Sequence, residues 1–210
     1  MSKLVQKVVL KIFGNNPVIA TIFIAMIPVI ELRGAIPFGS SKEIWGDDAL
    51  SVFEASVYGL IGSIISGVII ILLLIPVFKI LKNTKLFKNL ILTFEEKFKK
   101  QSGKIESEVS NKKKWVKKWL GVMVFVAIPL PFTGVWTGSA ISVFLQMGFL
   151  KSFLAVSIGA VVAAFIMAFI SLVLGGSAIV IFYIFIVLFL LVMFFYLVRA
   201  FMIGKTEKNI

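Results

Sequence analysis

Long uncharged stretches alternate with short clusters of charged residues along the chain. Residues 55–78, 152–174 and 178–198 contain no charged side chain, and each is long enough to cross the roughly 30 Å apolar core of a bilayer as a helix. No comparable alternation of polar and apolar positions indicates strands. The pattern therefore predicts an all-α integral membrane protein.

Two other apolar runs do not fit one straight transmembrane helix each. Residues 17–30 would rise only about 21 Å, whereas residues 119–150 would rise about 48 Å, too far for one bilayer. Both runs carry residues that break helices, namely Pro28, Pro37, Pro129 and Pro131. We predict a re-entrant hairpin in each, with the turns at residues 31–34 and 129–138. A full crossing by residues 17–38 stays open as an alternative.

The two halves of the chain match weakly at an offset of 100 residues. Gly34 corresponds to Gly134 and Gly59 to Gly159, and residues 53 and 55 are identical to residues 153 and 155. Each half is then a re-entrant helical hairpin followed by a transmembrane helix, and the halves run in opposite directions, as in the inverted repeats of many transporters. The predicted order within one membrane domain is an interfacial helix (1–14), repeat 1 (15–78), a basic loop with an amphipathic helix (79–118), repeat 2 (119–175) and an extra C-terminal transmembrane helix (178–199).

Composition and charge agree with a membrane protein. The 210 residues are 60% hydrophobic, with a mean hydropathy of +1.06, well above soluble averages. The net charge is +12, and thirteen of the 22 Lys and Arg lie between Lys79 and Lys118. In so apolar a chain this cluster indicates a cytoplasmic loop that attracts anionic lipid, not a surface for nucleic acid.

The cationic C-terminus reaches the same side as this loop only if residues 119–150 re-enter. We therefore predict a multi-pass protein of the cell membrane with a cytoplasmic C-terminus. The same topology places Lys3, Lys7 and Lys11 outside, against the positive-inside trend. Small residues along the helix of residues 55–78 permit a homodimer without requiring one.

The absence of cysteine and histidine limits the chemistry. It excludes thiol chemistry, metal sites built from cysteine and the usual imidazole base. The sequence also places no pair of carboxylates within the apolar regions that suits metal binding or acid–base catalysis. We therefore predict no enzyme activity, no cofactor and no metal. Proton coupling would have to use a carboxylate, and Glu31 is the candidate.

Glu31 and Arg33 directly follow an uncharged run from residue 12 to residue 30. Ionisable groups at membrane depth are costly and usually face protein or a water-filled cavity. In the functional interpretation, Arg33 and the amides near Gly34 and Gly134 bind an anion, while Glu31 takes up and releases a proton. Neutral hydrogen bonds would come from Thr133, Thr137 and Ser139. The alternative is that both charges are structural and pin the hairpin tip.

Two motifs resemble the paired motifs of the putative small multidrug export proteins. They read E-L-R-G-A-I-P at Glu31–Pro37 and P-L-P-F-T-G-V-W-T-G at Pro129–Gly138. More distantly, the chain resembles the DedA membrane proteins and the related VTT-type scramblases, over roughly residues 15–175. This resemblance implies two facing re-entrant hairpins and the transport of a small molecule or lipid, with undecaprenyl phosphate among the substrates associated with DedA proteins. The arginines of the second DedA hairpin have no counterpart here.

Three functions remain open from the sequence. The first is a proton-linked translocase for an anionic lipid or lipid carrier, with Glu31 and Arg33 at the midplane. The second is an exporter of lipophilic cationic drugs, in which Glu31 is the counter-charge. The third is a membrane scaffold that transports nothing and acts through its basic loop.

Overall fold

The structure, a computed structural model, describes residues 11–82, 111–130, 132–174, 187, 190, 191 and 193–195. Every regular element in these residues is helical. In chain order they are α2 (Pro17–Met26), α3 (Glu31–Gly39), α4 (Lys42–Trp45), the 3-10 helix η1 (Gly46–Asp48), α5 (Val52–Lys82), α7 (Asn111–Ala127), α8 (Val135–Phe144) and α9 (Phe149–Val173).

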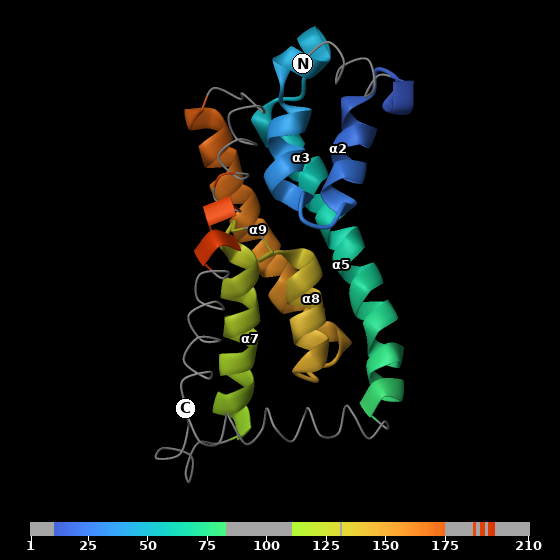
Figure 1. The fold of residues 1–210 in the computed structure, drawn as a ribbon, viewed down its shortest axis with the longest axis vertical. Coiled ribbons are helices and arrows are strands. Elements are labelled where there is room, and N and C mark those ends of the chain that lie inside the picture. Colours follow the sequence, from blue (N-terminus) through green and yellow to red (C-terminus); the bar gives the residue numbers. More distant parts are fainter. Residues whose placement is uncertain are drawn as a thin grey trace, which may run out of the picture.

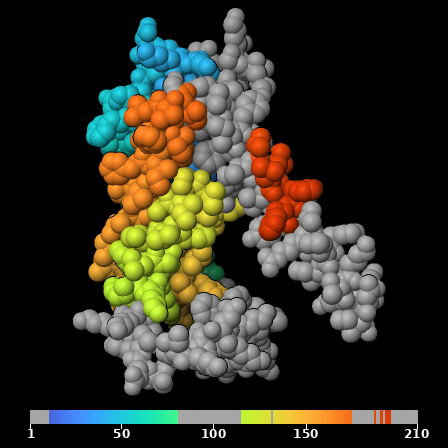
Figure 2. Space-filling model, turned by 90° about the vertical axis from the view of Figure 1, so that its left-hand side faces the viewer, coloured from blue at the N-terminus to red at the C-terminus, as the bar shows by residue number. Residues whose placement is uncertain are grey.

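Helices α5 and α9 are the two described helices that are long and apolar enough to cross a membrane. Much of their apolar surface is not covered by protein, and Phe165 and Phe169 of α9 are 73% and 68% exposed. Figure 2 shows this outer face of α9, in orange, with α7 packed beside it in yellow-green. Because a core helix of a soluble protein would be covered on most sides, the exposure favours a membrane environment.

The shorter helices form two pairs at opposite ends of the molecule. Helices α2 and α3 pack together at one end and α7 and α8 at the other, so that the turns of the two pairs approach each other near mid-height (Figure 1). Helix α5 packs on α2, α3, α8 and α9, while α9 also packs on α3, α7 and α8. The main apolar core lies where α3, α7, α8 and α9 meet, with Ile36, Val126, Val135 and Met167 almost fully buried.

Glycines allow each long helix to approach the first helix of its neighbouring pair. A Cβ on Gly62 of α5 would overlap the carbonyl oxygen of Ile22 in α2. A Cβ on Gly159 of α9 would lie 2.6 Å from the carbonyl oxygen of Met123 in α7. Gly59, the predicted counterpart of Gly159, instead faces Leu32 and its neighbours in α3.

Both predicted turns lie a few residues from their observed positions. The first turn is at residues 27–30 instead of 31–34, because Ile27 is extended (φ −75°, ψ 129°) before Pro28 and ends α2 at Met26. The second turn lies between the end of α7 at Ala127 and the start of α8 at Val135, instead of at residues 129–138. Glu31 therefore begins a helix and does not form the turn.

The prediction that Pro37 breaks a helix is wrong, because Pro37 lies inside α3. Proline lacks the amide that would bond to the carbonyl four residues earlier and its ring crowds that carbonyl, yet α3 continues for two more residues to Gly39. Pro28 and Pro129 do lie in the turns between helices. Pro131 lies outside the described residues, as do residues 1–10 of the predicted interfacial helix, the amphipathic part of the basic loop and most of the C-terminal helix.

The connection between α3 and α5 carries the acidic residues Glu43, Asp47 and Asp48. It contains α4 and η1, and the Trp45 indole donates a hydrogen bond to the Phe38 carbonyl at 3.0 Å. The Phe38 and Trp45 rings also meet edge to face, with centroids 5.5 Å apart. This small cluster packs against the C-terminal end of α3.

Candidate functional site

Glu31 and Arg33 lie in the first turn of α3, at the tip of the first helix pair. Their side chains are only 4% and 6% exposed. Both face the turn that precedes α8, so residues about 100 positions apart in the sequence meet there. Buried charges are stable only where hydrogen bonds or opposite charges compensate them, and each of these two has such partners on the second helix pair.

The Glu31 carboxylate caps the N-terminus of α8. Its Oε2 accepts a hydrogen bond from the Val135 amide and its Oε1 accepts one from the Trp136 amide, both at 3.0 Å. These are the first two amides of α8, which have no acceptor within the helix. The positive end of the helix dipole further favours a negative charge at this place.

Gly134 makes this cap sterically accessible. A Cβ at this position would overlap the Glu31 carboxylate. The Gly134 backbone itself is extended (φ −171°, ψ −166°), a conformation open to any residue. Glycine is therefore needed here because the carboxylate approaches closely, not because of backbone strain.

Arg33 binds the same turn from the neighbouring position. Its Nη2 donates hydrogen bonds to the carbonyl oxygen of Thr133 and, at 3.1 Å, to the Thr133 hydroxyl. The Thr133 hydroxyl also accepts from the Leu130 amide at 3.0 Å and lies 2.6 Å from the Ile128 carbonyl. Arg33 thus holds a turn that Thr133 already orders.

Trp136 and Thr137 complete the contact between the two tips. The Trp136 indole donates to the Met26 carbonyl at the end of α2, at 3.1 Å. Thr137 accepts from the Gly134 amide at 3.1 Å and donates to the Phe132 carbonyl at 2.7 Å. Trp136 is not among the site residues predicted from the sequence. Its position in the first turn of a helix beside two hydrogen-bonding threonines is the signal that could have identified it.

Left-handed backbone occurs in both tips at residues other than glycine. Val29 has φ 73° and Glu31 has φ 43° in the first tip, and Phe132 has φ 66° in the second. For a branched or bulky residue such a conformation is a true outlier, costing on the order of 1–3 kcal/mol. Strain of this kind persists only where surrounding contacts fix the backbone, and it is concentrated at functional sites.

A pocket of about 360 Å³ lies beside the two charged residues. Glu31, Arg33, Gly134 and Thr137 line it, together with apolar groups from both tips and from α5 and α8. The other lining residues are Pro28, Val29, Ile70, Leu74, Phe132, Trp136 and Ala140. The volume is that of a small-ligand site, and apolar walls with a few convergent polar groups are typical of such sites.

The remaining predicted site residues do not line this pocket. Thr133 accepts hydrogen bonds from Arg33, and Gly34 is buried within α3. Ser139 is fully buried against α5, with its hydroxyl 3.5 Å from the Gly67 carbonyl. Within the described part of the chain, no group of three or more His, Cys, Asp or Glu is arranged to hold a metal ion.

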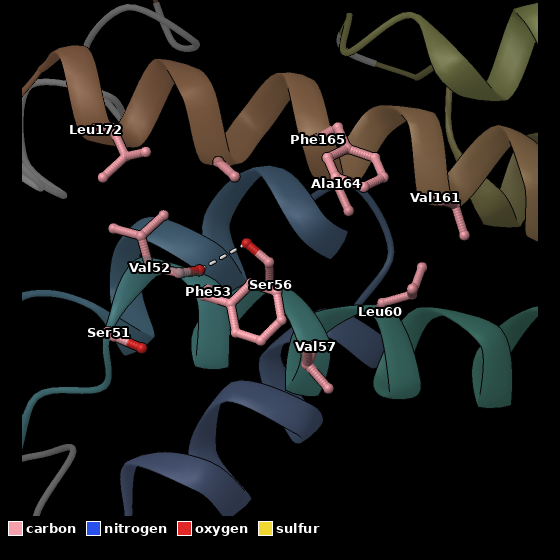
Figure 3. Close-up of a pocket in the computed structure, with 11 residues that line it drawn as sticks. Ser51, Val52, Phe53, Ser56, Val57, Leu60, Val161, Ala164, Phe165 and Leu172 are labelled. Atoms are coloured by element: carbon pink, nitrogen blue, oxygen red, sulfur yellow. Dashed lines mark hydrogen bonds between the residues drawn. The ribbon is translucent and has the colours of Figure 1, made fainter.

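A second hollow, between α5 and α9, is purely apolar in character (Figure 3). It measures about 470 Å³, and Val57, Leu60, Phe165 and Leu172 project into it from the two helices. Its Ser56 hydroxyl donates to the Val52 carbonyl of its own helix at 2.7 Å. None of the described residues that line this hollow is ionisable, so it suits a hydrocarbon chain better than a charged group.

These features define a helical membrane protein in which a buried carboxylate and a buried guanidinium lie beside a pocket between two helix pairs. The family described as "Putative small multi-drug export protein" matches residues 31–166, and the chain belongs to this family. The match begins at Glu31 and extends into α9, so it contains Glu31, Arg33 and the whole second tip, but not residues 27–30 of the first turn. No curated protein and no solved structure matches the chain. The family's description indicates a membrane transporter.

Proposed function

We propose that the protein is a proton-linked membrane transporter for an anionic lipid or lipid carrier, with Glu31 and Arg33 at its centre. The observation that carries this proposal is the Glu31 cap on α8. Two backbone amides at a helix N-terminus form a ready site for a phosphate or carboxylate. In this protein a carboxylate of the chain itself occupies that site, beside a guanidinium and a pocket.

Charge balance links the proton to the substrate. Ionised Glu31 and Arg33 together carry no net charge, so an anion that entered the pocket would leave an uncompensated negative charge in an apolar region. Protonation of Glu31 weakens its hold on the amides of Val135 and Trp136 and leaves a net positive charge. An anionic head group then takes over the amides and Arg33, and one proton enters with each negative charge.

The proposed membrane arrangement is an inverted repeat of two re-entrant hairpins. Helices α2 and α3 contain 10 and 9 residues, so each rises about 15 Å, half of the bilayer core. Residues 27–30, 128–130 and 132–134 carry irregular backbone, which a bilayer tolerates only where protein or a cavity satisfies it. The contacts of Glu31, Arg33 and Trp136 between the tips supply such partners. We also propose, as part of this arrangement, that the chain is a distant relative of the DedA proteins.

Export of lipophilic cations is the second candidate, and one feature of the pocket favours it. The rings of Phe132 and Trp136 line the pocket together with Glu31, as expected for a site that holds an organic cation. In that case Glu31 is the counter-charge and Arg33 opposes binding. The two functions therefore predict opposite effects of removing the guanidinium.

Transport by the purified protein in proteoliposomes separates the two functions. The probes are a fluorescent polyprenyl phosphate and a lipophilic cationic dye, each with and without a pH gradient. For the anionic function, Arg33→Ala abolishes movement of the phosphate probe, and Glu31→Gln removes its dependence on the pH gradient. Glu54→Gln is the matched control, because Glu54 is an exposed carboxylate that caps α5 through Ser51.

Two results would reject the proposal. The first is dye transport that tolerates Arg33→Ala and is lost in Glu31→Gln, which identifies a cation exporter. The second is a cellular phenotype that persists in the Glu31→Gln, Arg33→Ala double variant, which identifies a scaffold. Arg33→Lys retains the positive charge. It therefore shows whether a loss of transport in Arg33→Ala is due to the missing charge or to misfolding.

A further inference from the structure

A third pocket, separate from Glu31 and Arg33, lies where the last turns of α5 meet the connection between α8 and α9. It measures about 440 Å³, and its polar lining residues are Lys79, Gln146 and Ser152. It shares no lining residue with the Glu31 pocket. We propose that this pocket binds a phosphate group carried by an anionic ligand.

Ser152 is the first observation that points to a ligand. Its side chain is only 1% exposed, it lines the pocket, and its hydroxyl has no hydrogen-bond partner among the described residues. A buried hydroxyl without a partner is costly, and natural structures rarely leave one so. An oxygen of a bound phosphate would provide the missing acceptor.

The N-terminus of α9 supplies further donors at the same place. Its N-cap is Gly148, which has φ 77° and contributes no side-chain cap. The first amides of the helix, at Phe149, Leu150 and Lys151, have no acceptor within the helix. They lie within one turn of Ser152, at the positive end of a 25-residue helix. This arrangement of amides is the one that phosphate groups use at helix N-termini.

The charge of the pocket fits the same ligand. Lys79 lines it from α5, and none of the described lining residues is acidic. Lys151, although it lies in the first turn of α9, is directed to the ring of Trp115 in α7, with its Nζ 4.8 Å from the ring centroid. Of the described lining residues, Lys79 is therefore the one that brings a positive charge to the pocket, and Lys151 offers a matched control at the same end of the molecule.

The apolar part of the lining favours a lipid as the source of the phosphate. Ile75, Phe78, Val143 and Phe149 lie in the same pocket as Lys79 and Ser152. Lys79 is also the first charged residue after the uncharged run of α5, where a helix leaves the apolar core for the lipid head groups. A phospholipid could place its phosphate on Ser152 and its glycerol region against these apolar side chains.

Ligand binding to the full-length protein in a neutral detergent tests the proposal. The probes are inorganic phosphate, a short-chain phosphatidylglycerol and the matching phosphatidylcholine, with affinity taken from the rise in melting temperature with concentration. We expect phosphatidylglycerol to bind, and Ser152→Ala and Lys79→Gln each to weaken it about tenfold, as the loss of one charge-assisted hydrogen bond predicts. If inorganic phosphate also binds and Ser152→Ala weakens its binding as well, the result supports the site and shows that a free phosphate is enough for binding.

Matched variants separate a ligand site from a structural role. Ser171→Ala removes another buried hydroxyl of α9 that has no partner, and Lys151→Gln removes the cation directed to Trp115. Neither should alter binding. Without ligand, Ser152→Ala should be at least as stable as the parent, because it removes an unpaired polar group. The proposal is overturned if phosphatidylcholine binds as tightly as phosphatidylglycerol, if no probe binds, or if Ser152→Ala and Ser171→Ala change binding equally.

Discussion

Replacing Gly134 by alanine tests whether the Glu31 cap joins the two helix pairs. The added Cβ would overlap the Glu31 carboxylate, so the carboxylate must leave the Val135 and Trp136 amides or the tips must separate. A hydrogen bond to a charged group contributes about 1.5–3 kcal/mol, so loss of both would cost about 3–6 kcal/mol. We expect Gly134→Ala to lower the free energy of unfolding by at least about 3 kcal/mol.

Gly121→Ala is the matched control for this substitution. Gly121 lies inside α7, and no atom lies within 4 Å of a Cβ placed on it. The same chemical change should therefore be neutral or should stabilise the helix by up to about 1 kcal/mol. The measurement is reversible unfolding in mixed micelles of a mild detergent and increasing SDS, followed by tryptophan fluorescence.

A double-mutant cycle then shows whether Glu31 is the cause. In a Glu31→Ala background no carboxylate remains to be displaced, and Gly134→Ala should cost less than about 1 kcal/mol. The coupling energy between the two positions should therefore amount to several kcal/mol. If Gly134→Ala costs the same in both backgrounds to within about 0.5 kcal/mol, the steric argument is wrong.

Two further predictions concern the start of α5 and the membrane topology. Ser51→Ala should destabilise the protein by about 1 kcal/mol, because Ser51 and Glu54 cap the start of α5 with hydrogen bonds of 2.7–3.2 Å. The substitution should leave transport intact. An unchanged melting temperature would contradict a stabilising role of this cap. Single cysteines at Lys42, Leu150 and Lys208 of the cysteine-free chain should be labelled in intact cells by an impermeant maleimide only at position 42. Labelling at 42 and 208 together would mean that residues 119–150 cross the membrane fully.

The two long helices could be predicted from the sequence, apart from their ends. Uncharged residues 55–78 and 152–174 correspond to α5 at Val52–Lys82 and α9 at Phe149–Val173. The helices are longer than the uncharged runs because charge marks the edge of the membrane, not the end of a helix. At the start of α5, the Ser51–Glu54 cap begins the helix before the apolar run.

The turns were predicted in the right regions but not at the right residues. Sequence reasoning placed the first turn at the charged residues, on the assumption that irregular backbone and charge coincide. The proline was the better signal, because the residue before a proline avoids helical geometry and α2 ends next to Pro28. An acidic residue then fits the first turn of the following helix, where Glu31 lies.

The partners of the site residues could not be predicted from local pattern. The bonds from Glu31 to α8 and from Arg33 to Thr133 join residues 100 or more positions apart, and no spacing rule of a single helix specifies them. The weak repeat aligned Gly34 with Gly134, whereas the structure brings Gly134 against Glu31. Which residues of the second motif meet the first depends on how the two tips are docked by α5 and α9.

The Glu31 cap also bears on whether the charged pair is structural or functional. A cap with a purely structural role does not need a charge. A serine or asparagine at the N-cap of α8 would accept a hydrogen bond from an amide of the first turn without burying a charged group. The chain instead places a glycine there and brings a carboxylate from the other helix pair. In the proposed transport function such a cap is exchanged, because an incoming phosphate offers the same amides an equivalent acceptor once Glu31 is neutralised. The strained backbone at Val29 and Phe132 lies beside this contact, and strain of this kind is concentrated at functional sites.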